Sequence, residues 1–76
     1  MVFENLKRIR LAKGVTQMHL SKKLGISNMA YSRMENGETK IDVERLRVIA
    51  VLLGVDINIF FDKELTEFVI EKHYVS

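Results

Sequence analysis

Residues 25–40, GISNMAYSRMENGETK, combine two kinds of side chain at the spacing of a short helix. One face of that helix would be apolar: Ile26, Ala30, Tyr31 and Met34. The opposite face would carry a small set that includes no acid: Asn28, Met29, Ser32 and Arg33. An ordinary solvated helix face carries Glu and Lys four residues apart, and such pairs are missing here. The set can donate and accept hydrogen bonds or touch a methyl group, and it does not repel an anion.

Capping residues and glycines divide the chain into five helical segments. Apolar spacing predicts the first helix over about residues 2–13. Each later segment begins at a residue whose side chain can accept hydrogen bonds from free backbone N–H groups: Thr16, Ser27, Asp42 and Asp56. Glycine, which tolerates the left-handed conformation, ends each of the first four: Gly14, Gly25, Gly37 and Gly54.

Apolar side chains in the second half of the chain complete the expected core. The fourth helix has a broad apolar stripe: Val43, Leu46, Ile49, Ala50 and Leu53. The fifth segment carries Ile57, Phe60 and Phe61. Residues 62–76 continue the helical spacing from Phe61, although FVIEKHYV is also rich in β-branched and aromatic residues and could form a short strand. We prefer the helix.

The predicted fold class is all-α, a five-helix bundle that forms one domain over residues 1–76. Its core would span residues 2–61, and residues 62–76 would form a C-terminal extension. Only Gly25, Ile26 and Ser27 separate the second and third helices, so these helices must cross steeply, in a helix-turn-helix. A small residue, Ser21, would let them approach closely.

The distribution of charge favours a polyanion as the partner. Residues 1–40 carry eight basic and three acidic side chains, whereas residues 41–76 carry four basic and seven acidic ones. A basic half beside an acidic half suits a small polyanion-binding domain, although chance scatter over a solvated surface would look similar. Cysteine is absent, which excludes disulfides and thiolate metal sites. No apolar run is long enough to span a membrane and no leader segment opens the chain, so we expect a soluble, cytoplasmic protein.

Two stretches carry a resemblance to a known family: LKRIRLAKGVTQMHLSKKLGIS and YSRMENGETKIDVERLRVIAVLLGVDINIFF. They resemble the phage Cro/repressor-type helix-turn-helix family (XRE family) of DNA-binding transcriptional regulators over about residues 5–61. The resemblance implies a bundle of the lambda-repressor type, with the second helix across the phosphate backbone and the third in the DNA major groove. Three residues depart from the family pattern: His19 replaces an acid, Tyr31 a branched aliphatic residue and Ile41 a proline.

The outward face of the third helix has the chemistry that base edges require. Asn28 can pair bidentately with adenine, and Arg33 can pair with guanine or a phosphate. Ser32 can serve either base, and Met29 can pack on a thymine methyl group. The alternative is a merely polar exposed face. The predicted DNA-binding residues are Gln17, Ser27, Asn28, Met29, Ser32, Arg33, Asn36 and Lys40.

Residues outside that face are expected to hold the DNA backbone or the third helix itself. Gln17 can hydrogen-bond a phosphate beside the free N–H groups that begin its helix. Asn36 and Lys40 would reach the backbone on the other side, although Lys40 could equally be a solvated surface lysine. By the resemblance, Arg10 and Glu35 form a partly buried ion pair that joins the first helix to the third, which is a structural role.

Catalytic chemistry has little support in the sequence. His19 and His73 are far apart, and no nucleophile, carboxylate pair or metal-ligand spacing accompanies them. We therefore expect two surface histidines, and no enzyme, metal or cofactor.

One helix in one major groove makes too few contacts for a specific site, so we expect a homodimer on a palindromic operator. The expected dimerisation residues are Phe60, Phe61, Leu65, Phe68 and Val69, because four helices already close the core. Phe60 could instead be buried within its own chain. The predicted function is that of a sequence-specific, double-stranded-DNA-binding transcriptional regulator without a membrane partner. The alternative is a protein-interaction module, such as an antitoxin that binds a partner protein.

Overall fold

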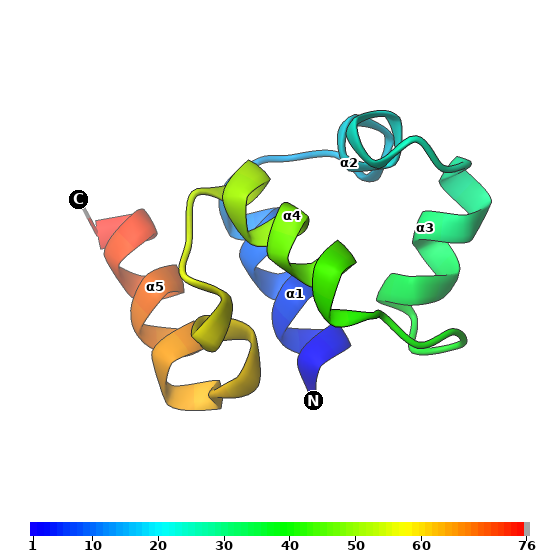
Figure 1. Ribbon diagram of the computed structural model, residues 1–76. Coiled ribbons are helices and arrows are strands. Elements are labelled where there is room, and N and C mark those ends of the chain that lie inside the picture. The colour runs from blue at the N-terminus through cyan, green and yellow to red at the C-terminus, as the bar shows by residue number, and fades with distance from the viewer. Residues whose placement is uncertain (76) are drawn as a thin grey trace.

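The computed structural model describes residues 1–75, and the side-chain surroundings through Lys72. The helices are α1 (Val2–Ala12), α2 (Gln17–Leu24), α3 (Asn28–Glu35), α4 (Val43–Leu53), the 3-10 helix η1 (Ile57–Phe61) and α5 (Lys63–Val75). No strand occurs within residues 1–75, so the predicted all-α class is confirmed and the tail is the helix that we preferred. Figure 1 shows α2 and α3 at one end of the molecule and α5 at the other.

The four predicted capping residues all begin a helix as expected. The Thr16 and Ser27 hydroxyls accept from the N–H groups of residues 19 and 30, each at 3.0 Å. The Asp42 and Asp56 carboxylates accept from residues 45 and 58, at 2.7 and 2.8 Å. A fifth cap, Asp62, accepts from the N–H groups of residues 64 and 65. Its extended backbone separates η1 from α5, so the helical run does not continue unbroken from Phe61 as the spacing suggested.

The core gathers side chains from α1, α2, α3, α4 and η1. Its buried members are Leu6, Ile9, Leu20, Tyr31, Met34, Leu46, Ile49, Ala50, Leu53 and Phe60. One residue of the expected α4 stripe, Val43, is exposed instead. It is the first residue of α4, where the chain is only entering the helix, and it lies at the rim of a surface pocket rather than over the core.

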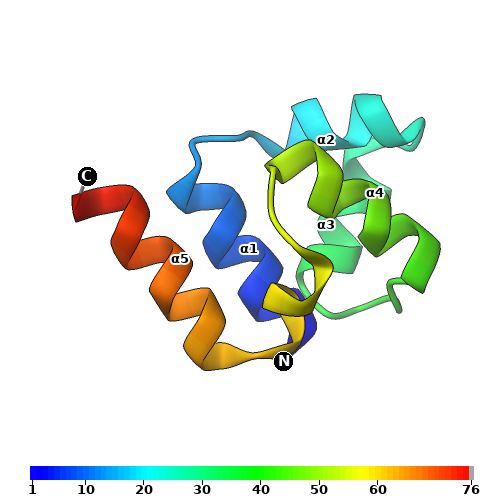
Figure 2. The same cartoon turned by 60° about the vertical axis from the view of Figure 1, so that its left-hand side comes forward.

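Helix α5 is attached to the rest of the molecule along α1. The two helices lie side by side and run in the same direction in both views (Figures 1 and 2). The buried Thr66 hydroxyl donates to the Ile59 carbonyl at 2.6 Å, and Arg8 forms an ion pair with Glu67 at 2.5 Å. The Asn5 amide donates to the Phe60 carbonyl at 2.8 Å and so fixes η1 on α1.

Candidate nucleic-acid interface

The turn between α2 and α3 has the geometry of a helix-turn-helix. Gly25 ends α2 in the left-handed conformation, with φ 70° and ψ 30°. The next N–H group, of Ile26, donates back to the Ser21 carbonyl at 3.0 Å, which closes the turn. Ser27 is then extended and begins α3. As a result α3 leaves α2 at a steep angle, and Figure 1 shows α2 almost end-on while α3 runs downward on the right-hand side.

Helix α3 separates its apolar and polar side chains as the spacing predicts. Tyr31 and Met34 are buried, whereas Asn28, Met29 and Arg33 are exposed. Ser32, between them, is half-buried. The only acid of this helix, Glu35, is 1% exposed. The outward face of α3 therefore presents hydrogen-bonding groups, a thioether and one guanidinium, with no carboxylate among them.

Asn28, at the start of α3, is held by the preceding helix. The Ser21 hydroxyl lies within hydrogen-bonding reach of both the Met18 carbonyl and the Asn28 side-chain oxygen. Its single proton serves one of these acceptors at a time. Within the described residues the amide N–H groups of Asn28 donate to no protein group. Asn28 thus offers two free donors, while its oxygen is partly occupied by Ser21.

Met29 and Arg33 lie together on the outward face, one helical turn apart. An Arg33 guanidinium nitrogen is 3.5 Å from the Met29 sulfur. Both side chains are exposed, so this weak contact guides the guanidinium along the helix without burying it. Ser27, in contrast, accepts the capping hydrogen bond of α3 with its hydroxyl oxygen, so its O–H proton and a second lone pair remain for a ligand.

The expected Arg10–Glu35 pair is present and lies behind α3. Arg10 donates to both carboxylate oxygens, and the closest contact is 2.7 Å. Another guanidinium nitrogen of Arg10 donates to the Val15 carbonyl, also at 2.7 Å. Both side chains are almost fully buried. The pair therefore joins α1, the α1–α2 loop and α3 through two side chains.

Burial and hydrogen bonding set the ionisation of Glu35, Arg10 and the neighbouring Tyr31. Burial, the largest single influence, raises the pKa of Glu35, but the lowering effects of Arg10, Tyr31 and Gln17 together outweigh it, and the pKa lies below its usual range. Hydrogen bonding to Glu35 raises the pKa of Arg10. Burial, and then the nearby Glu35 carboxylate, raise the pKa of the Tyr31 hydroxyl, which makes no hydrogen bond within the described residues. At neutral pH the site thus holds one cation, one anion and a neutral phenol.

Gln17, the first residue of α2, is tied to the same carboxylate. Its side-chain amide donates to Glu35 at 3.2 Å, so one donor faces inward rather than toward a ligand. One amide N–H group remains for an anion. The backbone N–H groups of residues 17 and 18 remain as well, since the Thr16 side chain and carbonyl take those of residues 19 and 20.

Asn36 and Lys40 follow α3 and are both exposed. Asn36 is the C-cap residue, and its amide lies 3.5 Å from the Ser32 hydroxyl. Gly37 then turns the chain with φ 80°, and a Cβ atom there would lie 2.7–2.9 Å from carbons of the Phe3 ring. This close approach fixes the end of α3 on the first turn of α1, and Lys40 extends from the segment that follows.

The expected dimerisation residues do not all lie on the surface. Phe60 is 0% exposed and completes the core, so its assignment to a dimer surface is wrong. In a 3-10 helix residues three apart share a face, so Phe60 points inward with the half-buried Ile57, while Phe61 points outward. Phe61 and Phe68 are each 59% exposed, Leu65 is exposed, and Val69 is half-buried. Lys72 lies over the Phe68 ring, 5.6 Å from its centre.

The remaining candidate groups do not form a site. His19 is exposed, and the side chain of His73 lies outside the described side chains. The described residues contain no group of three His, Cys, Asp or Glu side chains that could hold a metal ion. Within the same part of the chain, every helix is too short or too polar to cross a membrane.

Two contacts of this interface were not foreseen from the sequence. Ser21 was expected only as a small residue at the α2–α3 contact, yet its hydroxyl holds Asn28. Gln17 was expected to face a phosphate, yet it also donates to Glu35. No pattern in the sequence signals either bond, because each depends on how α2 is oriented against α3.

The sequence is similar to those of known proteins. The helix-turn-helix family model matches residues 6–60, most of the chain. Three relatives from Bacillus subtilis (strain 168) carry the words "uncharacterized HTH-type transcriptional regulator" in their names. YqaE is 36% identical over 88% of this chain and 58% of its own length. YqaF is 39% identical over 82% of both chains.

The third relative, the SPbeta prophage-derived YonR, is 35% identical over 68% of this chain and 48% of its own length. The chain thus spans only about half the length of YqaE and YonR. No solved structure matches it at a significant level. With a family model over most of its length and relatives of this similarity, the chain belongs to the Cro/repressor-type (XRE) helix-turn-helix family of DNA-binding transcriptional regulators.

Proposed function

We propose that the protein regulates transcription by binding a palindromic operator in double-stranded DNA as a homodimer. The observation that carries this proposal is the outward face of α3, which has hydrogen-bonding groups and no carboxylate because its one acid is buried. Such a face can enter the major groove without repelling phosphates. The regulator names of its relatives agree with this role. Occupation of the operator would block or recruit the polymerase.

Three side chains of α3 are proposed to contact bases. Arg33 is exposed and can pair with a guanine edge, and Met29, beside it, can pack on a thymine methyl group. Asn28 offers two free N–H donors, which suit the acceptor positions of adenine or guanine. Full bidentate pairing with adenine would use the second lone pair of its oxygen. The half-buried Ser32 hydroxyl would contact only a base that lies close to α3.

The ends of α2 and α3 are proposed to contact the DNA backbone. At the start of α2, the free N–H groups of residues 17 and 18 and the remaining amide N–H of Gln17 can receive one phosphate. Asn36 and Lys40 would receive a second phosphate beyond the end of α3. Since Glu35 fixes Gln17 and the end of α3 together, the distance between these two phosphate sites would be constant.

A second copy of the chain is proposed to pack against α5. Leu65 and Phe68 are exposed three residues apart on α5, so they form an apolar row on one face of that helix that water would otherwise cover, and the exposed Phe61 precedes this row in η1. The half-buried Val69 lies beside this row. Two copies joined there would have to present their α3 helices to half-sites about 34–36 Å apart or a multiple of that distance. In the alternative function, that of a protein-interaction module, a partner protein would cover the same row.

Selection from random DNA, followed by binding assays at two salt concentrations, tests the proposal. We expect an enriched palindrome and an affinity that falls with salt by about 0.9 log units per log unit for each phosphate contacted. Sedimentation of the free protein and of the complex would then give two chains per operator. Enrichment of no sequence, with weak binding that depends little on salt, would reject DNA recognition and favour the interaction module.

A further inference from the structure

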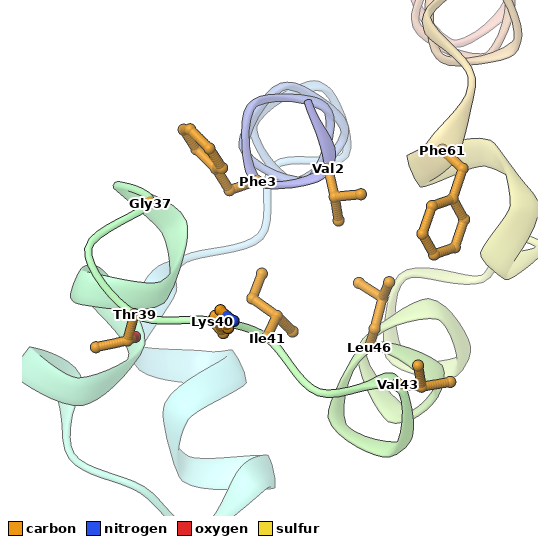
Figure 3. A pocket seen from close by; sticks show the side chains of 9 residues that line it. All are labelled: Val2, Phe3, Gly37, Thr39, Lys40, Ile41, Val43, Leu46 and Phe61. Atoms are coloured by element: carbon orange, nitrogen blue, oxygen red, sulfur yellow. The ribbon is translucent and has the colours of Figure 1, made fainter.

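A surface pocket lies beside the DNA-facing end of the molecule, and the proposed DNA contacts do not use its interior. It has a volume of about 360 Å³, within the range of small-molecule sites. Figure 3 shows that Val2 extends from α1 toward Ile41 and Leu46, and that the Phe61 ring closes one side. The interior of the pocket is therefore built from apolar side chains of α1, α4, η1 and the segment before α4.

The pocket accounts for two exposed apolar side chains. Val43 and Phe61 are each more than half exposed, and both lie on its wall. An apolar ligand in the pocket would cover both of them and bury further surface of Val2 and Ile41. A ligand of this kind would need no hydrogen-bond partner in the interior, because the side chains that line it there are hydrocarbon.

The described residues that line the pocket carry positive charge only. Lys40 is the only charged residue among those that line it, and no carboxylate is among them. Thr39, the residue before it, supplies a hydroxyl. A ligand with an apolar body and one anionic group would therefore find one counter-charge, and no carboxylate, among the described residues that line the pocket.

Two features connect this pocket to the DNA-facing surface. Phe3 and Gly37, which form one wall, are the contact that seats the end of α3 on α1. Lys40, at the mouth, is also the side chain proposed to reach a DNA phosphate. The ammonium group of Lys40 cannot serve a ligand and a phosphate fully at the same time.

We propose that this pocket binds a small apolar carboxylate, of the size of a medium-chain fatty acid, and that the bound carboxylate competes with DNA for Lys40. The ligand thereby weakens operator binding. The second half of this statement rests on the proposed function, whereas the binding of the ligand itself does not.

Titration calorimetry of the full chain with sodium decanoate tests the ligand site without DNA. We expect one decanoate per chain, and no binding of butyrate in the same concentration range because it buries much less apolar surface. Lys40→Gln should weaken decanoate binding about fivefold, as for one solvent-exposed ion pair, and leave decanol binding unchanged. An equal loss of affinity for decanoate and for decanol in Lys40→Gln would overturn the assignment of Lys40. Absence of decanoate binding to the wild type would overturn the site.

A matched pair of tryptophan variants locates the ligand. Val2→Trp places an indole in the pocket and should weaken both decanoate and decanol binding about tenfold. Val51→Trp, on an exposed part of α4 that does not line the pocket, should leave both unchanged. Circular dichroism checks that each variant is folded. If Val2→Trp does not fold, Val43→Trp, at the rim of the pocket, replaces it. Decanoate binding that survives both pocket variants would overturn the proposal.

Operator binding supplies the final readout. Saturating decanoate should weaken operator binding by the wild type about as much as Lys40→Gln does, and the Val2→Trp variant should need about tenfold more decanoate for the same effect. Sedimentation in the same buffers tests a second occupant: loss of a dimer in Val2→Trp would assign the pocket to another copy of the chain and overturn the small-molecule site. If the wild type binds no DNA at all, the proposed function fails, while the calorimetry still decides the ligand site.

Discussion

The Arg10 guanidinium and the Glu35 carboxylate are joined by three hydrogen bonds, although the two residues are 25 positions apart in the chain. Arg10 also holds the Val15 carbonyl, and Glu35 also holds Gln17. This pair is therefore the point at which α1, the start of α2 and the end of α3 are fixed relative to one another.

Removal of one partner should be costly for stability. Glu35→Gln leaves the Arg10 guanidinium buried without a counter-charge, and we expect the free energy of unfolding to fall by about 3–5 kcal/mol. Urea denaturation followed by circular dichroism measures this change. The double variant Arg10→Met/Glu35→Leu, which removes both charges, should recover much of the loss. A double variant less stable than Glu35→Gln would show that the loss of stability comes from losing the ion pair itself and not from the isolated buried charge.

The same pair predicts how stability depends on pH. Because the pKa of Glu35 is lower in the folded protein, its contribution is present above the pKa of an unfolded glutamate, about 4.3, and is lost as the pH falls through the folded value. The melting temperature of the wild type should therefore fall more steeply below about pH 4.3 than that of Arg10→Met/Glu35→Leu. Parallel melting curves for the two proteins between pH 7 and pH 3 would contradict this assignment.

Substitutions on the outward face of α3 should affect specific binding alone. Asn28→Ala and Arg33→Ala should each weaken operator binding by about 1–3 kcal/mol and leave the fold intact, because both side chains are exposed. Fluorescence anisotropy with the selected operator and with a scrambled duplex measures the difference. Lys63→Ala, an exposed charge change on α5, serves as the control. Unchanged operator affinity in both α3 variants would rule out α3 as the reading helix.

A substitution at Lys40 should act on all sequences alike. Lys40→Ala removes one proposed phosphate contact, so affinity for operator and for scrambled DNA should fall together. The slope of log affinity against log salt should become shallower by about one unit. Titrations at several salt concentrations give that slope. A loss restricted to the operator would instead indicate that Lys40 contacts a base.

The apolar row on α5 should control assembly. Leu65→Ser/Phe68→Ser should remain folded, because both side chains are exposed, and should sediment as a monomer at micromolar concentration with weaker operator binding. Val51→Ser, on α4 and exposed as well, is the matched control. Truncation after Asp62 is a poorer test, since it also removes Thr66 and Glu67, which hold α5 to the rest of the fold. A double variant that stays dimeric would place the interface elsewhere.

Local signals made most of the helices predictable. A cap such as Thr16 and a stop such as Gly25 act on backbone groups within a few residues, so their effect is visible in the sequence. The 3-10 turn of η1 was not visible in this way, and it decides that Phe60 faces the core while Phe61 faces solvent. The bonds from Ser21 to Asn28 and from Gln17 to Glu35 were also missed, since they depend on how whole helices pack.

The contact between Gly37 and Phe3 fixes one end of α3, and the Gly25 turn with the Ser27 cap fixes the other. Neither attachment involves Met29 or Arg33, which lie between them on the outward face. The identity of those two side chains can therefore change without loosening the helix that displays them. This division between anchorage and display lets a scaffold of this kind acquire a new target sequence by exchanging a few exposed residues.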